Sequence, residues 1–215
     1  MANLPTSHWL LSQETRALLN RLDRVKPFAL HETMVPAAMP PLPAFSAIER
    51  YLVIGRQELR RLVGGYLNWL HSPAGQAASP AEAQRRFVFL RIRFNTILSQ
   101  FDIFADVITQ RSEHEIGVWL SGLDVLAADA LTLPGGYVEP MPLVTYLDRG
   151  HGAAIRRART RLPGGGENPV GIIRVPRERM VSNSIASSLV HEVGHQGVAL
   201  LDLVDSVRQP LRALS

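Results

Sequence analysis

Two long segments with apolar residues at helical spacing constrain the fold of this chain more than any other feature. Over residues 46–71 and again over residues 79–110, apolar side chains recur three or four positions apart. Each segment begins with a serine three residues before a glutamate, the spacing of a helix capping box. Residues 87–104 are so apolar that we expect the second helix to lie at the centre of a bundle.

Shorter segments extend this pattern to both sides. Helices are predicted over residues 13–24, capped by Ser12, and over residues 115–131. The composition changes at the turn sequence Leu133-Pro134-Gly135-Gly136. The pattern beyond it predicts strands over residues 143–147 and 170–175, a helical arginine-rich segment over 153–161, and a helix over 185–207 that Ser182 or Ser184 caps and Pro210 ends.

The predicted class is therefore α+β, mostly α. A helical bundle over residues 1–132 precedes a small α+β half over residues 133–215, with a short sheet and a final helix. A chain of 215 residues has enough volume for one large domain or two small ones, so the two halves could also form one continuous domain.

The composition excludes several classes of protein. With 46% apolar and 20% charged residues, the chain has the balance of a globular protein. The absence of cysteine excludes disulfides, thiolate metal sites and a cysteine nucleophile. No uncharged apolar run approaches the roughly 18 residues of a membrane span. The N-terminal sequence lacks the pattern of a signal peptide, so we expect a cytoplasmic protein without a membrane partner.

The positive charge is a weaker signal. A net charge of +4 would suit a nucleic-acid partner, but all except one of the 23 basic residues are arginine, a bias that runs along the whole chain. The densest run, residues 156–161, has no aromatic residue interleaved for base stacking. We therefore expect no nucleic-acid partner, and expect this run to be a solvated face or a clamp for substrate carboxylates.

One motif carries recognisable chemistry, the sequence His191-Glu192-Val193-Gly194-His195. Residues four apart lie on one face of a helix, so both imidazoles can reach a single metal ion. Glu192 lies beside the first histidine, where its carboxylate can take a proton from a metal-bound water. Because apolar residues flank the motif on both sides, we expect its helix to be largely buried, and a buried cluster of this kind needs a metal or hydrogen bonds.

The motif resembles that of the zincin metallopeptidases, and the resemblance covers about residues 170–203. It implies a gluzincin-like site in which His191 and His195 bind Zn²⁺ and Glu192 is the general base. The strand just before the motif is similar to the edge strand of such enzymes. By this resemblance the backbone of Ile172, Ile173, Arg174 and Val175 would hold an extended peptide or protein substrate.

The third metal ligand departs from the family patterns. The metzincin pattern requires a histidine or aspartate at the position of Leu201, and the gluzincin pattern takes a later glutamate, yet none follows His195. Three sources stay open, and we favour the first: a residue beyond Ser215 if the chain is a fragment; Asp202 or Asp205 if the helix breaks at Gly197; or an upstream group such as His151 or Glu113.

Two other functions are compatible with the same residues. Two histidines and a carboxylate can also bind Fe²⁺ in a peptide-modifying oxygenase, which iron content and 2-oxoglutarate-dependent oxygen consumption would reveal. Alternatively, the chain is a non-catalytic helical scaffold or binding protein in which the motif is structural. The sequence leaves the substrate, the oligomeric state and the role of the helical half undetermined.

Overall fold

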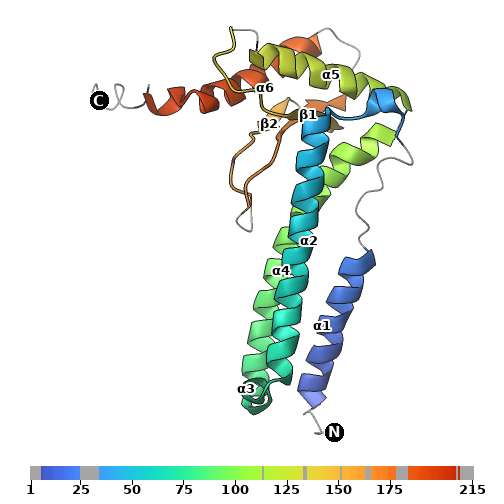
Figure 1. The fold of residues 1–215 in the computed structure, drawn as a ribbon, viewed down its shortest axis with the longest axis vertical. Helices are drawn as coiled ribbons and strands as arrows, with labels where there is room; N and C mark the ends of the chain where they lie inside the picture. The colour runs from blue at the N-terminus through green and yellow to red at the C-terminus, as the bar shows by residue number, and fades with distance from the viewer. Residues whose placement is uncertain are drawn as a thin grey trace. The chain divides into compact units, whose positions relative to one another are not determined.

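The computed structural model describes residues 6–24, 34–112, 114–132, 135–150, 152–162, 166–177, 184–206 and 208. Its elements, in chain order, are α1 (Thr6–Arg24), η1 (Pro36–Ala38), α2 (Leu42–His71), α3 (Pro73–Ala77), α4 (Pro80–Thr109), η2 (Gln110–Ser112), α5 (His114–Thr132), β1 (Leu143–Asp148), β2 (Ala154–Arg156), β3 (Gly171–Pro176) and α6 (Ser184–Leu200) (Figure 1). This is the predicted class, α+β and mostly α. Within the described ranges, no helix combines the length and apolar character that crossing a bilayer requires.

The chain divides into two compact units. Unit 1 comprises residues 1–28 and 49–102, and unit 2 comprises residues 29–48 and 103–215. The helices α2 and α4 each place their larger part in unit 1 and one end in unit 2. The change of composition at residue 133 places the helix α5 in the predicted N-terminal half. In the structure α5 belongs to unit 2, where it packs on β1 and α6.

In unit 1, α2 and α4 run antiparallel side by side and are joined through α3 (Figure 1). Serine side chains cap α3 and α4. Ser72 accepts a hydrogen bond from the backbone N–H of Gly75 at the start of α3, and Ser79 accepts one from that of Glu82 at the start of α4, each at 3.2 Å. The helix α1 is fixed to this hairpin by a hydrogen bond of 3.0 Å from His8 Nε2 to the carbonyl of Gly75.

Two of the expected helix starts are wrong. The helix α1 begins at Thr6, and Ser12, its expected cap, lies inside the helix with its hydroxyl 3.2 Å from His71 Nε2. The helix α2 begins at Leu42, one turn before the expected cap Ser46. In both cases tertiary contacts extend the helix beyond its local capping signal.

The expectation that α4 lies at the centre of a bundle is met on one face of the helix only. One face of α4 packs in the core of unit 1, where Phe87 and Phe94 are at most 1% exposed, but Phe89 is 66% and Ile92 57% exposed. The other helices of unit 1 are too few to cover every side of α4, so an apolar surface remains on it.

Unit 2 is built on a three-stranded sheet in the order β1-β3-β2. The central strand β3 pairs in parallel with β1, with Leu143 opposite Gly171, and antiparallel with β2, with Ala154 opposite Arg174. The strand β2 falls in the arginine-rich segment 153–161, so the expectation of a helix there is wrong. Pairing with β3 provides the hydrogen bonds that the local sequence does not specify.

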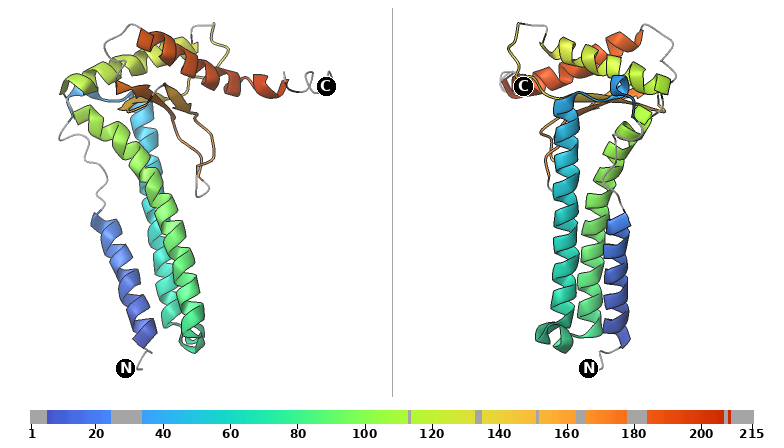
Figure 2. Two further views of the ribbon diagram at one scale, coloured as in Figure 1. Left: turned by 180° about the vertical axis from the view of Figure 1, so that it is seen from behind. Right: turned by 45° about the vertical axis from the view of Figure 1, so that its right-hand side comes forward.

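The helices α5 and α6 lie on the same face of this sheet (Figure 2). Their buried side chains form one core with alternate residues of the strands. It contains Leu120, Leu123, Ala127 and Leu131 from α5, Leu143 and Leu147 from β1, Ile173 and Val175 from β3, and Ile185, Leu189 and Val193 from α6. The sheet and α5 therefore form the support that holds α6 in place.

A buried group of polar side chains, the Thr145 network (Arg111, Asp124 and Thr145), ties η2 and α5 to β1. Arg111 and Asp124 are fully buried and form an ion pair of 2.9 Å. Asp124 Oδ1 accepts from the backbone N–H of Thr145 at 2.7 Å, and Arg111 donates to the carbonyl of Thr145 at 2.7 Å. These two side chains thus satisfy the backbone groups of Thr145 as a neighbouring strand would.

Candidate metal centre

The helix α6 has one buried face and one exposed face. Its buried residues are Ile185, Leu189, Val193 and Gln196, at the spacing of a helix stripe. His191 and His195 are exposed, Glu192 is half-buried, and Val190 is 47% exposed. The expectation that this helix is largely buried is therefore wrong, because only one side packs on the core of unit 2.

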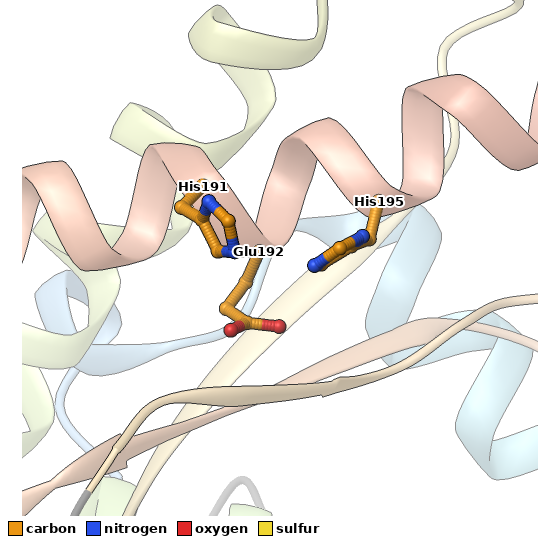
Figure 3. Close-up of side chains that lie close together, drawn as sticks. All are labelled: His191, Glu192 and His195. Atoms are coloured by element: carbon orange, nitrogen blue, oxygen red, sulfur yellow. The ribbon is translucent and has the colours of Figure 1, made fainter.

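The motif residues converge on one side of α6. The metal-ligating atoms of His191, Glu192 and His195, the α6 cluster, all lie within 4.8 Å of one another. The two imidazole rings are 4.8 Å apart between centroids and nearly perpendicular, at 85°. Figure 3 shows both rings projecting from the same side of the helix, with the carboxylate between them in this view. The helical spacing of the motif produces this convergence without help from another element.

The atoms of the α6 cluster are available to a ligand. The three side chains make no hydrogen bond or ion pair with another residue in the described part of the chain. Two atoms bound to one Zn²⁺ lie at most about 4.2 Å apart, so small side-chain rotations from the present positions close the site. The donor set, two imidazole nitrogens and a carboxylate oxygen, therefore fits zinc or iron(II).

The predicted third ligands are not brought to this cluster. The helix continues through Gly197 to Leu200 instead of breaking, so the condition under which Asp202 or Asp205 would ligate is not met. Among the described residues, the α6 cluster is the one group of metal-ligating side chains within reach of a common ion, and neither aspartate belongs to it. His151, Glu113 and any residue beyond Ser215 lie outside the described residues.

The end of α6 also differs from the expectation of a helix to residue 207. The helix ends at Leu200 and a turn follows, in which Asp202 has a left-handed backbone with φ of 51°. One further helical turn covers residues 203–206. Ser182, one of the two expected caps, and Pro210, the expected stop, lie outside the described residues, whereas Ser184 is the first residue of the helix.

The expectation of an edge strand at residues 170–175 is wrong. The strand β3 is central, and Ile172, Ile173 and Arg174 pair with β1 on one side and β2 on the other. Ile172, Ile173 and Val175 are buried, whereas Arg174 lies 3.7 Å from Asp148. A nearly continuous apolar run is typical of a strand covered on both sides rather than of an edge. A peptide cannot add to this backbone.

The outer edge of β1 is closed as well. The backbone N–H of Thr145 donates to Asp124, and its carbonyl accepts from Arg111. The side-chain amide of Gln110 occupies those of Leu147, with both hydrogen bonds at 2.7 Å. No described strand pairs with the outer side of β2, so β2 provides the remaining edge of the described sheet.

The sequence analysis missed one polar residue next to the motif. Gln196 directly follows His195 and is 1% exposed, on the apolar stripe of α6. A polar residue at a core position of a helix was the available signal, because buried polar groups need partners.

Comparison of the chain with protein-family models, with curated proteins and with solved structures finds no match. The candidate site therefore rests on the geometry of α6 and its surroundings.

Proposed function

We propose that this protein is a zinc-dependent metallopeptidase. The observation that carries the proposal is the α6 cluster: two imidazoles and a carboxylate that converge on one side of a helix, with their donor atoms within 4.8 Å and no partner among the described residues. Because no internal bond holds these donor atoms, only water has to be displaced when an ion binds.

In this proposal His191 and His195 bind the metal through imidazole nitrogens, and Glu192 acts as general base. A zinc ion held there would lower the pKa of a water molecule to about 7 and so supply a nucleophile. Glu192 would take up a proton as general base and return one to the leaving amine as general acid. Its half-buried position beside both rings suits a base that stays next to the metal. The exposed face of α6 leaves room for a peptide, and the outer edge of β2 can align its backbone.

The test combines metal content with turnover. We expect near-stoichiometric zinc in the wild-type protein and in Glu192→Gln, and loss of zinc in His191→Ala. Peptide hydrolysis by Glu192→Gln should fall by about 10²–10⁴-fold, the usual contribution of a general base. Glu115→Gln, which changes an exposed glutamate on α5, is the matched control and should keep both properties.

Two results would contradict the proposal. Unchanged turnover in Glu192→Gln removes the catalytic role of this residue. Iron in place of zinc, together with oxygen consumption that depends on 2-oxoglutarate, favours the oxygenase that uses the same ligand types. If none of these proteins holds a metal and His191→Ala is as stable as the wild type, the non-catalytic alternative is preferred.

A further inference from the structure

A pocket of about 360 Å³ lies in unit 2 along the C-terminal half of α6. We call it the arginine pocket. Its lining includes Arg157, Arg159, Gln196, Ala199, Leu200 and Asp202. The size suits one amino-acid side chain or the end of a peptide rather than a large cofactor.

The arginine pocket lies next to the α6 cluster on the same helix. Gln196 is four residues after Glu192, and Ala199 is four residues after His195. Residues with this separation are neighbours on a helix surface, about 5–6 Å apart between Cβ atoms. A group bound in the pocket is therefore about one helical turn, roughly 5.4 Å, from the proposed metal, which an extended peptide covers in one to two residues.

Gln196 supplies the first argument for a ligand. Its Oε1 accepts from the backbone N–H of Ala158 at 3.0 Å, which fixes the orientation of the amide. The Nε2 group on the other side donates no hydrogen bond to a described residue, and the side chain lines the pocket. An amide N–H that is fixed in orientation and has no internal acceptor is available to an acceptor on a bound molecule.

The arginines supply the charge. Arg157 is half-buried and forms no ion pair with a carboxylate in the described part of the chain. Arg159 pairs with Glu139 at 2.9 Å, but both partners are more than half exposed, so this pair is weak. A guanidinium and an amide donor that line the same pocket match the acceptor oxygens of a carboxylate.

The backbone of the pocket is also unusual. Among the described residues, Arg159 and Asp202 are the two that are not glycine and have positive φ, at 62° and 51°. Both line the arginine pocket. A hydrogen bond of 2.9 Å from the N–H of Arg159 to the carbonyl of Asn168 holds the first in place. Strained backbone of this kind is concentrated at binding and catalytic sites.

We propose that the arginine pocket binds a carboxylate of the peptide substrate, through Arg157 and the Nε2 group of Gln196, beside the scissile bond. The carboxylate belongs either to an acidic side chain or to the C-terminus of the peptide. This proposal rests on the proposed peptidase function, because the pocket acquires its role from the metal centre next to it. Asp202 also lines the pocket, and its negative charge opposes a bound carboxylate, whereas Arg157 and Arg159 favour it.

The first test measures binding without turnover. The metal-free protein is titrated with two small acids, N-acetyl-aspartate amide for the side-chain carboxylate and N-acetyl-alanine for the terminal one. Their carboxamide analogues serve as neutral controls. We expect one acid to shift the Gln196 Nε2 resonance in ¹H–¹⁵N spectra saturably, and its neutral analogue to leave it unchanged.

Variants assign that shift to the pocket. Arg157→Gln should weaken acid binding by at least about tenfold, as expected for a lost hydrogen bond to a charged group. Arg161→Gln, an exposed arginine of the same run outside the lining, should bind like the wild type. Arg157→Lys keeps the charge but not the planar fork, and should lie between them. Equal binding of acids and amides, or normal binding by Arg157→Gln, overturns the proposal.

The second test separates this proposal from the peptidase function. Peptides with and without an acidic residue, and with a free or amidated C-terminus, are compared by kcat/KM. We expect the zinc-loaded protein to prefer one carboxylate source by at least about tenfold, and Arg157→Gln to lose that preference. Cleavage without any preference overturns the pocket assignment and leaves the peptidase. A saturable Gln196 shift with no cleavage of any peptide overturns the peptidase and leaves a carboxylate site.

Discussion

Two groups of charged and polar side chains in unit 2 differ in almost every physical respect. In the Thr145 network the ionic side chains are 0% exposed, and their bonds go to each other and to the strand β1. In the α6 cluster both imidazoles are exposed, and no described residue binds any of the three side chains. The Thr145 network makes its hydrogen bonds inside the protein, whereas the donor atoms of the α6 cluster bind no described residue and are available to a ligand.

The difference separates a structural use of such residues from the metal-binding use that we propose for the α6 cluster. Burial raises the pKa of Asp124, and the Arg111 guanidinium and the Thr145 hydroxyl oppose this shift. Such a carboxylate needs its partners for stability, because removing them would leave a buried charge uncompensated and destabilise the protein by several kcal/mol. The exposed cluster gives up nothing when it binds a ligand, since its atoms exchange water for metal. We therefore expect stability to depend on the first group and binding on the second.

The largest effect is expected from Arg111→Met. This change removes the countercharge of Asp124 and should lower the free energy of unfolding by about 3–5 kcal/mol. Glu139→Gln breaks an exposed ion pair of the same length, 2.9 Å, and should cost about 0–1 kcal/mol. Urea unfolding of both variants gives the comparison.

The unfolding of unit 2 can be followed separately. Trp119 on α5 packs against the core of unit 2, whereas Trp9 and Trp69 belong to unit 1. Replacing the latter two with phenylalanine makes Trp119 the fluorescent reporter. If Arg111→Met then costs no more than Glu139→Gln, the Thr145 network is not the structural element described above.

An intermediate effect is expected from metal. Zinc at 100 times its dissociation constant should stabilise the wild-type protein by about 2.7 kcal/mol through mass action. His191→Ala should lose this stabilisation, because one imidazole cannot hold the ion alone. Asp202→Asn should retain it, since Asp202 is not part of the α6 cluster. Thermal unfolding with and without zinc measures the difference, and equal stabilisation of all three proteins would place the metal elsewhere.

The smallest effect is expected from the histidines without metal. With a chelator present, His191→Ala should change the free energy of unfolding by no more than about 0.5 kcal/mol, as is usual for exposed positions. A loss above about 1 kcal/mol in urea unfolding would mean that the ring has a structural role. It would also remove the contrast between the α6 cluster and the Thr145 network.

The local features of the fold and of the site could be predicted from the sequence. The motif residues converge because four-residue spacing on a helix brings them together, whatever the rest of the chain does. Ser79 caps α4 as its position before Glu82 indicates, and both strands flanking the arginine-rich segment lie within one residue of their expected bounds. These features depend on neighbours in the sequence.

The features that depend on distant residues could not be predicted. Arg111 looks like any other arginine of the chain, and its burial follows from Asp124 and Thr145, 13 and 34 residues away. The central position of β3 depends on β1 and β2 together. Apolar content also failed to show which side of α6 is covered, because exposed Val190 and buried Leu189 have the same character.

The strand order β1-β3-β2 has a consequence for how unit 2 assembles. Leu143 of β1 pairs with Gly171 of β3, 28 residues further along the chain, and β2 pairs with the other side of β3. Closing a loop of this length costs chain entropy and slows folding. On a ribosome, β1 and β2 therefore emerge before the strand that joins them. The sheet can form only after residue 176 has been synthesised, and α6 then completes the core immediately afterwards.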